Sequence, residues 1–228
     1  MSNSLPQGSP PMLLYTAPLS MFAMKVEIAL REKNLAFERV SVAYSAADGY
    51  HPKNAEVLRV NPKRQVPVLI HGDLELFDST QIFEYLEDLA PVVPLWPSPS
   101  SDRARARLLE HTSDEVFFPH IIKLMGLQED LKNPVAVTAI DSARDYYLEM
   151  ECVLGVKQFL VGEFSYADIA FYMAQLFAER MGALLTEACP RLTAWRERVS
   201  ARPSVPQTLA PMIAHLREHG RPVPGFVS

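Results

Sequence analysis

The sequence predicts a chain of two parts, an α/β domain of order β-α-β-α-β-β-α followed by an all-α domain. In the first 90 residues, short apolar runs of strand length alternate with apolar residues at helical spacing. After the segment PVVPLWPSPS, which breaks regular structure, only the helical spacing remains. The boundaries we expect are a disordered tail at residues 1–11, the α/β domain at 12–90, a linker at 91–100 and the helical domain at 101–228.

The α/β domain is expected to begin with a strand, a helix and a second strand. Met12–Thr16 is an apolar run that ends just before Pro18, which indicates a strand. A helix over residues 20–33 follows, and Asn34 suits its end because asparagine tolerates the left-handed conformation. Phe37–Val42 is the second strand. Because a helix joins the two strands, we expect them to be parallel.

A short helix and a β-hairpin complete this domain. Asn54–Val60 predicts the helix. A Gly-Asp pair separates the apolar runs Val66–Ile70 and Leu74–Phe77, and such a pair is typical of a hairpin turn. Either Asp78 or Ser79 can then cap the last helix of the domain.

The second half is predicted to be helical throughout. Ser165 and Asp168 have the spacing of a capping box, with aspartate in place of the longer glutamate. A polar, proline-containing tail is expected after Pro203. The predicted helices are residues 103–125, 135–154, 165–181 and 190–201.

Composition excludes several classes of protein. The 228 residues are 48% hydrophobic and 21% charged with a net charge of −5 and no basic cluster interleaved with aromatic residues, so nucleic acid is not expected as a partner. No uninterrupted apolar run approaches the roughly 18 residues that a membrane span needs, so a membrane is not expected either. The two cysteines, Cys152 and Cys189, show no metal-ligand spacing, so we expect no metal site. So few cysteines favour a reducing, cytoplasmic location.

Four segments of the sequence resemble the cytosolic glutathione transferase family. They occur in the family's order and spacing, and the resemblance covers about residues 12–205. The segments are YTAPLS at 15–20, NPKRQVPVL at 61–69, DSTQI at 78–82 and SYADIA at 165–170.

The resemblance implies a thioredoxin-like N-terminal domain that binds glutathione as co-substrate, and a helical domain that supplies the pocket for a hydrophobic electrophile. It further implies a detoxifying transferase, a homodimer and no metal. Within the family, the chain is most similar to the bacterial, serine-type classes that are phi- or theta-like, because a serine and no cysteine stands in the first turn.

Ser20 stands at the position of the activating serine of those classes. A free thiol with a pKa near 8.5 is only slightly ionised at neutral pH, so the enzyme must favour the thiolate. A hydroxyl hydrogen bond and a helix N-terminus can both do this. Ser20 can equally be a simple helix cap, and the hydroxyls of Tyr15 and Thr16 are its competitors.

The resemblance also assigns the other contacts to glutathione. Gln65-Val66-Pro67 corresponds to the family's cis-proline loop, whose backbone pairs with the cysteinyl part. Asp78 and Ser79 suit the γ-glutamyl ammonium and carboxylate groups, and Lys53 suits the glycine carboxylate. Each of these residues also has an ordinary structural interpretation as a strand start, a helix cap or a solvated cation.

The second-substrate pocket is the hardest part to assign from the sequence, because aromatic residues at helical spacing are usually core. The candidates are Met21, Phe22, Phe117, Phe118, His120 and Tyr172.

Two other functions stay open. One keeps glutathione but changes the reaction to dehalogenation, ether cleavage or isomerisation. The other is a glutathione-transferase-like binding protein without turnover, because a fold does not fix a function.

Overall fold

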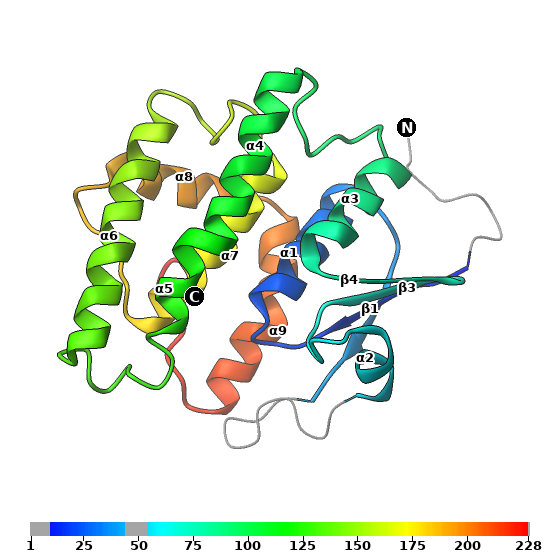
Figure 1. Ribbon diagram of the computed structural model, residues 1–228, viewed down its shortest axis with the longest axis horizontal. Helices are drawn as coiled ribbons and strands as arrows, with labels where there is room; N and C mark the ends of the chain where they lie inside the picture. Colours follow the sequence, from blue (N-terminus) through cyan, green and yellow to red (C-terminus); the bar gives the residue numbers. More distant parts are fainter. Residues whose placement is uncertain (1–9, 44–53, 228) are drawn as a thin grey trace. The chain divides into compact units, whose positions relative to one another are not determined.

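The computed structural model describes residues 10–43 and 54–227 (Figure 1). Most of the expected disordered tail, and Lys53, lie outside the described residues. The chain divides into two units. The first comprises the residues up to Pro94 together with Gln207–His215, and the second comprises Leu95–Pro206 and the residues from Leu216 onward.

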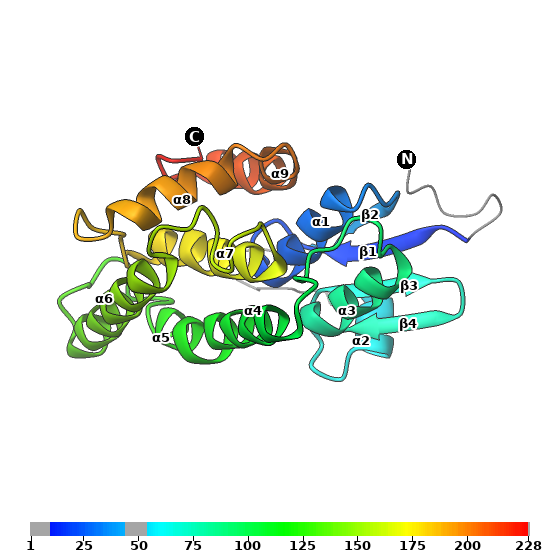
Figure 2. The same ribbon diagram turned by 90° about the horizontal axis from the view of Figure 1, so that it is seen from above.

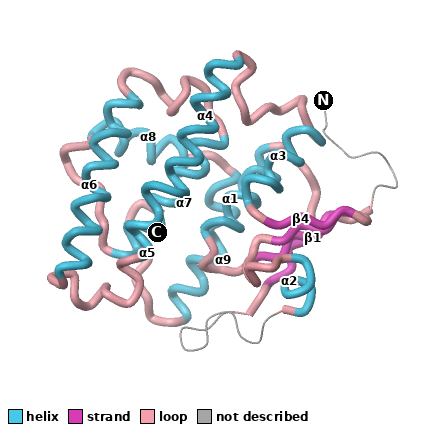
Figure 3. The backbone as a smooth tube through the Cα atoms, viewed as in Figure 1, coloured by secondary structure: helices cyan, strands magenta, loops and turns pink. Residues whose placement is uncertain are grey.

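The first unit contains a four-stranded sheet of order β2-β1-β3-β4. Strand β1 pairs in parallel with β2 and antiparallel with β3, and β3 pairs antiparallel with β4. The predicted parallel pair and the predicted hairpin are therefore both confirmed. The strands, magenta in Figure 3, are β1 (Met12–Thr16), β2 (Glu38–Ser41), β3 (Val68–His71) and β4 (Leu74–Phe77).

Three helices cover the two faces of this sheet. Helices α1 (Met21–Glu32) and α3 (Ser79–Leu89) pack on one face, where Leu14, Val26 and Ile82 belong to one buried cluster. Helix α2 (Ala55–Val60) covers the other face, where a second buried cluster joins strand and helix residues. Alternate residues of β1 belong to one or the other of these two buried clusters, because successive side chains of a strand point to opposite faces of the sheet.

The second unit is built from helices (Figure 2). The predicted helix 103–125 is not uniform, because a π-helical turn at Ser113–Phe117 separates its two α-helical parts. Across the described residues, no helix is both long enough and apolar enough to span a membrane. The helices are α4 (Ser100–Thr112), α5 (Phe118–Ile122), α6 (Pro134–Leu154), α7 (Tyr166–Met181) and α8 (Pro190–Ser200).

Asp168 organises the interior of the second unit. Its carboxylate is fully buried and accepts hydrogen bonds from Leu160 N at 2.9 Å, Ser165 N at 2.9 Å, Ser165 Oγ at 3.0 Å and Trp195 Nε1 at 2.8 Å. The predicted capping box is confirmed. Burial raises the pKa of Asp168, and the donors oppose that shift. One aspartate therefore joins the α6–α7 loop, the start of α7 and helix α8.

The prediction of a tail after Pro203 was wrong. Residues Ser204–Glu218 form helix α9, which contains Pro211 in its interior. Leu209, Met212 and Leu216 are buried at helical spacing and give this helix an apolar face. The prolines obscured this pattern, although burial of such a face stabilises a helix more than its propensities do.

Candidate functional site

The register of the sheet brings three of the predicted segments to one edge. Val68 on β3 pairs with Tyr15 on β1 and with Phe77 on β4. The three residues form one row across the sheet. The first turn follows Tyr15, Val66 and Pro67 precede Val68, and Asp78 follows Phe77. The segments that the sequence singled out for glutathione therefore leave the sheet together.

Ser20 is the N-cap residue of α1. Its Oγ accepts a hydrogen bond from Ala23 N at 3.3 Å, and its own N–H donates to Ala17 O at 3.1 Å. The residue is 8% exposed. The cap uses the hydroxyl as an acceptor only, so its O–H remains available as a donor. Capping and donation to a thiolate are therefore compatible in this geometry.

The two competing hydroxyls lie in the interior of the first unit. Tyr15 belongs to the buried cluster on the α2 face, and burial raises the pKa of its hydroxyl. Thr16 is fully buried, and its Oγ1 has no hydrogen-bond partner among the described residues. Of the three, only Ser20 combines a position in the first turn with a helix N-terminus.

The peptide bond between Val66 and Pro67 is cis. Both residues are buried, whereas Gln65 is exposed. Since Pro67 directly precedes strand β3, the backbone of Val66 lies just beyond the row formed by Tyr15, Val68 and Phe77, at the end of the strands. An extended peptide can pair there with the main chain, as in β-strand addition.

Asn61 fixes the loop that leads to Pro67. The sequence alone did not predict this role. Its Nδ2 donates to Gln65 O at 2.6 Å, and its Oδ1 accepts from Lys63 N at 2.9 Å. Asn61 O accepts from Arg64 N at 2.8 Å, and Asn61 is only 4% exposed. The signal in the sequence was an asparagine after a helix, because asparagine side chains commonly bind the backbone two residues on.

Asp78 is the N-cap residue of α3. Its Oδ1 accepts from Thr80 N at 3.1 Å and Gln81 N at 3.3 Å. Its φ of 75° and ψ of 125° lie outside the left-handed helical region that aspartate tolerates, so the backbone is strained at this cap. Ser79, the first residue of the helix, is 4% exposed. The pair thus presents a carboxylate beside a helix N-terminus, one group for a cation and one for an anion.

The predicted second-substrate residues of the first unit are two neighbours on α1. Met21 is 2% exposed. Phe22 is partly buried, and Lys25 Nζ lies 5.5 Å from the centre of its ring. Only Phe22, two residues after Ser20, therefore offers apolar surface near the candidate hydroxyl, whereas Met21 is core.

The predicted second-substrate residues of the second unit are mostly core. Phe117 is fully buried and stacks on Tyr146 with ring centres 4.9 Å apart. Tyr172 is also fully buried, and its hydroxyl lies 2.8 Å from Ser200 Oγ. Phe118 packs edge-on against Phe177, and His120 is partly exposed. This unit therefore does not gather the four residues on one open surface.

One group in the described part of the chain has the residue types and spacing of metal ligands. His215, Glu218 and His219 place their ligand atoms within 4.8 Å of one another near the end of α9. They lie far along the chain from the residues predicted to bind glutathione, and attack by a thiolate on an electrophilic carbon does not require a metal.

Two family models match consecutive parts of the chain. One, described as "Glutathione S-transferase, N-terminal domain", matches residues 14–110, and the other, "Glutathione S-transferase, C-terminal domain", matches residues 115–203. Among similar proteins, Glutathione S-transferase U25 of Arabidopsis thaliana is 32% identical over 197 residues, which cover 83% of this chain and 85% of the relative.

Two further proteins show the range of the similarity. A Stringent starvation protein A homolog of Coxiella burnetii is 31% identical over 152 residues, which cover 67% of this chain and 68% of the relative. The crystal structure of a glutathione S-transferase from Rhodospirillum rubrum F11 superimposes with a TM-score of 0.80 at 26% identity, covering 95% of this chain and 98% of the other. With both domain models and relatives matching along most of its length, the chain belongs to the glutathione S-transferase family.

Proposed function

We propose that this transferase conjugates glutathione to a hydrophobic electrophile and that Ser20 keeps the glutathione sulfur in its thiolate form. The observation that carries the proposal is the position of Ser20 at the N-cap of α1, in the turn that follows strand β1. The sulfur then attacks an electrophilic carbon, a new C–S bond forms and the leaving group departs.

Two of the three segments at this end of the sheet fit the cysteinyl and γ-glutamyl parts of the tripeptide. The buried backbone at Val66 suits the cysteinyl part, which pairs with it as an added strand. The pair Asp78 and Ser79 suits the γ-glutamyl end, because its ammonium needs an anion and its carboxylate needs N–H or O–H donors. Lys53 remains the proposed partner of the glycine carboxylate.

The free energy by which Ser20 must stabilise the thiolate over the thiol is modest. A thiol pKa lowered by about 2 units makes the thiolate the major form at neutral pH and corresponds to about 2.7 kcal/mol. A hydrogen bond to a charged acceptor contributes roughly 1.5–3 kcal/mol, and a helix N-terminus adds about 0.3–1 kcal/mol. One hydroxyl at a helix start therefore suffices without a metal or a separate general base.

A small hydrophobic electrophile, a homodimeric state and a cytoplasmic location are parts of the proposal. The partly buried ring of Phe22, two residues after Ser20, supports an apolar second substrate. Glutathione-dependent dehalogenation, ether cleavage or isomerisation would use the same thiolate. The first two expel halide or an alkoxide or phenoxide from the carbon that sulfur attacks, whereas isomerisation breaks the new C–S bond again and returns glutathione.

Two measurements on the purified chain test the proposal. Glutathione should raise the melting temperature, because a ligand at 100 times its Kd stabilises the folded state by about 2.7 kcal/mol. The rate of conjugation of an aryl halide should rise with glutathione concentration and level off as the glutathione site becomes saturated. Binding without aryl conjugation, but with release of halide from alkyl halides, would favour the dehalogenase. No stabilisation and no retention on immobilised glutathione would favour the non-catalytic binding protein.

A further inference from the structure

The end of helix α9 carries three side chains whose chemical types suit a transition-metal ion. They are His215, Glu218 and His219, in the sequence HLREH. Their ligand atoms, which are imidazole nitrogens and a carboxylate oxygen, all lie within 4.8 Å of one another. Two ligand atoms of a tetrahedral zinc ion are roughly 3.4 Å apart, so small rotations of the side chains would bring the three atoms to bonding positions.

Helical spacing explains why these three side chains meet. Residues three and four apart lie on one face of a helix, so His215 is a neighbour of both Glu218 and His219. Arg217 is two positions from His215 and therefore belongs to a different face of the helix. The cluster occupies five consecutive residues, and its geometry depends on the end of α9 alone.

The backbone that carries the cluster is fixed at the end of α9. Leu216, which lies between the two histidines in the sequence, is only 2% exposed. Gly220 has a φ of 62°, and its N–H donates to Arg217 O at 3.1 Å. Arg221 N–H donates to Leu216 O at 2.8 Å. These two hydrogen bonds form a Schellman motif, so His219 stands in an ordered turn, which reduces the ordering cost of binding an ion.

An ion can reach the cluster from solvent. Glu218 and His219 are exposed, and His215 is partly exposed. The partial negative charge at the C-terminal end of a helix favours a cation, and the carboxylate of Glu218 adds a full negative charge. The cations that follow in the sequence, Arg217 and Arg221, are both exposed, so solvent and salt screen their repulsion of a metal ion.

We propose that His215, Glu218 and His219 bind a zinc ion, with water in the remaining coordination position. Two histidines and one carboxylate are a ligand set that zinc accepts, whereas magnesium and calcium prefer oxygen ligands alone. The sequence-based expectation of no metal depended on the spacing of the two cysteines, and this site contains no cysteine. The site uses none of the residues proposed to bind glutathione, so it does not depend on the proposed function.

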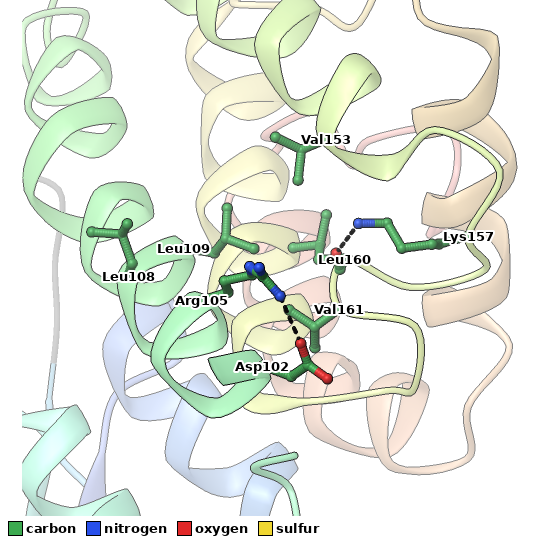
Figure 4. Close-up of a pocket in the computed structure, with 8 residues that line it drawn as sticks. All are labelled: Asp102, Arg105, Leu108, Leu109, Val153, Lys157, Leu160 and Val161. Carbon is green, nitrogen blue, oxygen red and sulfur yellow. Dashed lines mark hydrogen bonds and ion pairs between the residues drawn. The ribbon is translucent and has the colours of Figure 1, made fainter. Parts of the chain in front are cut away.

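Zinc could also bind elsewhere on the chain. The pocket in Figure 4 contains one carboxylate, that of Asp102, which already pairs with Arg105 at 2.8 Å. The described residues that line this pocket include no histidine and no cysteine. Cys152 on α6 is an exposed thiol and is therefore a stronger competitor. A test of the α9 site needs a variant of this cysteine.

Calorimetry with zinc chloride as the probe tests the site. It uses the purified full chain without a histidine tag, glutathione or a chelating buffer. We expect one zinc ion to bind per chain, and magnesium chloride at the same concentration not to bind. His219→Gln should weaken zinc binding at least about tenfold, because loss of even an outer-shell partner of a metal costs roughly 10–100-fold in affinity. The ring NMR signals of His215 and His219 should shift on titration.

The matched control is His111→Gln, because His111 is also an exposed histidine near the end of a helix, α4. This variant should bind zinc as the parent chain does. Glu218→Gln keeps the size of the side chain and removes its charge, so it should also weaken zinc binding at least about tenfold. Each variant changes an exposed side chain, so its melting temperature without zinc should match that of the parent.

Three results would overturn the proposal. The first is unchanged zinc affinity in both His219→Gln and Glu218→Gln. The second is binding that Cys152→Ser abolishes and His219→Gln retains, because the thiol would then hold the ion. The third is an equal loss in His111→Gln and His219→Gln, which would indicate nonspecific binding to surface histidines. Since glutathione is absent from these experiments, their outcome is independent of whether the chain conjugates glutathione.

Discussion

Asn61 Nδ2 donates to the carbonyl oxygen of Gln65 at 2.6 Å, and this hydrogen bond spans the loop that leads into the cis peptide at Val66. The same side chain accepts from Lys63 N. Asn61 therefore sets the path of the backbone proposed to pair with the cysteinyl part of glutathione, and we assign it no contact of its own with the tripeptide.

Replacing Asn61 with alanine should raise the KM for glutathione about tenfold while changing kcat less, because the loop backbone loses two side-chain hydrogen bonds worth roughly 1 kcal/mol each. Steady-state kinetics with varied glutathione measures this split. The matched control is Asn54→Ala. Asn54 is the N-cap of helix α2, and Asn61 is the residue that follows the other end of this helix. The control variant should cost about 1 kcal/mol of stability and leave the KM unchanged. An equal rise in both variants would argue for a general loss of stability instead.

Asp78→Asn should separate the charge of this residue from its role as a cap. Asparagine has nearly the same shape as aspartate and caps helices as well, so the melting temperature should hardly change. The KM for glutathione should rise by roughly tenfold, because one charge-assisted hydrogen bond is lost. A glutathione analogue without the γ-glutamyl amine provides the control. The variant should bind glutathione and this analogue with similar affinity, and a persisting preference for glutathione would exclude Asp78 as the partner of the amine.

Asp168→Ala should lower the free energy of unfolding by about 3 kcal/mol or more, because buried donors from Leu160, Ser165 and Trp195 lose their acceptor. Urea unfolding followed by tryptophan fluorescence measures the change. Asp141→Ala is the control, because Asp141 forms an exposed ion pair with Arg144 and should matter by less than about 0.5 kcal/mol. Similar losses in the two variants would remove Asp168 from its proposed place in the core.

Buried tyrosines should make the chain sensitive to alkali. Burial raises the pKa of Tyr146 to about 12 and that of Tyr172 to about 12, against an ordinary value near 10. The folded state thus keeps protons that the unfolded state releases between pH 10 and 12, so stability is intact below pH 10 and falls as the pH rises through this window. Urea unfolding at pH 9 and pH 11 measures the fall.

Tyr146→Phe removes one of these titrating groups, so its loss of stability from pH 9 to pH 11 should be smaller than that of the parent chain. The exposed-cation variant Arg144→Gln is the control. It should keep the parental pH dependence, because guanidinium groups do not titrate in this range. An identical fall in the parent and in Tyr146→Phe would contradict the assignment.

Local patterns predicted most elements of the fold. Asn34 has a φ of 54° at the end of α1, as its residue type suggested, and the Gly-Asp pair forms the turn of the β3–β4 hairpin. Helix α9 was missed because its prolines outweighed its apolar spacing, and the π-helical turn at Ser113–Phe117 leaves no clear mark in the sequence. Both depend on tertiary burial, which a single sequence does not contain.

The candidate site was predicted in its residue types but not in its geometry. Ser20 and Asp78 are recognisable as helix caps, whereas the row Tyr15–Val68–Phe77 depends on strand register. Register follows from the packing of both sheet faces and of the turns between strands. The role of Asn61 was hidden for a similar reason, since its partners are backbone groups of a loop whose path the sequence does not specify.

The most direct test of the proposed role of Ser20 is the pKa of the glutathione thiol bound to the chain, measured from thiolate absorbance in the parent and in Ser20→Gly. Glycine is a fair N-cap, so this change removes the hydroxyl at a cost of only a few tenths of a kcal/mol in helix stability. We predict that the pKa of the bound thiol lies about 2 units below its free value near 8.5 in the parent chain. In Ser20→Gly, this pKa should rise most of the way back to the free value. A bound thiol with an unshifted pKa, or a shift that survives in Ser20→Gly, would contradict this role.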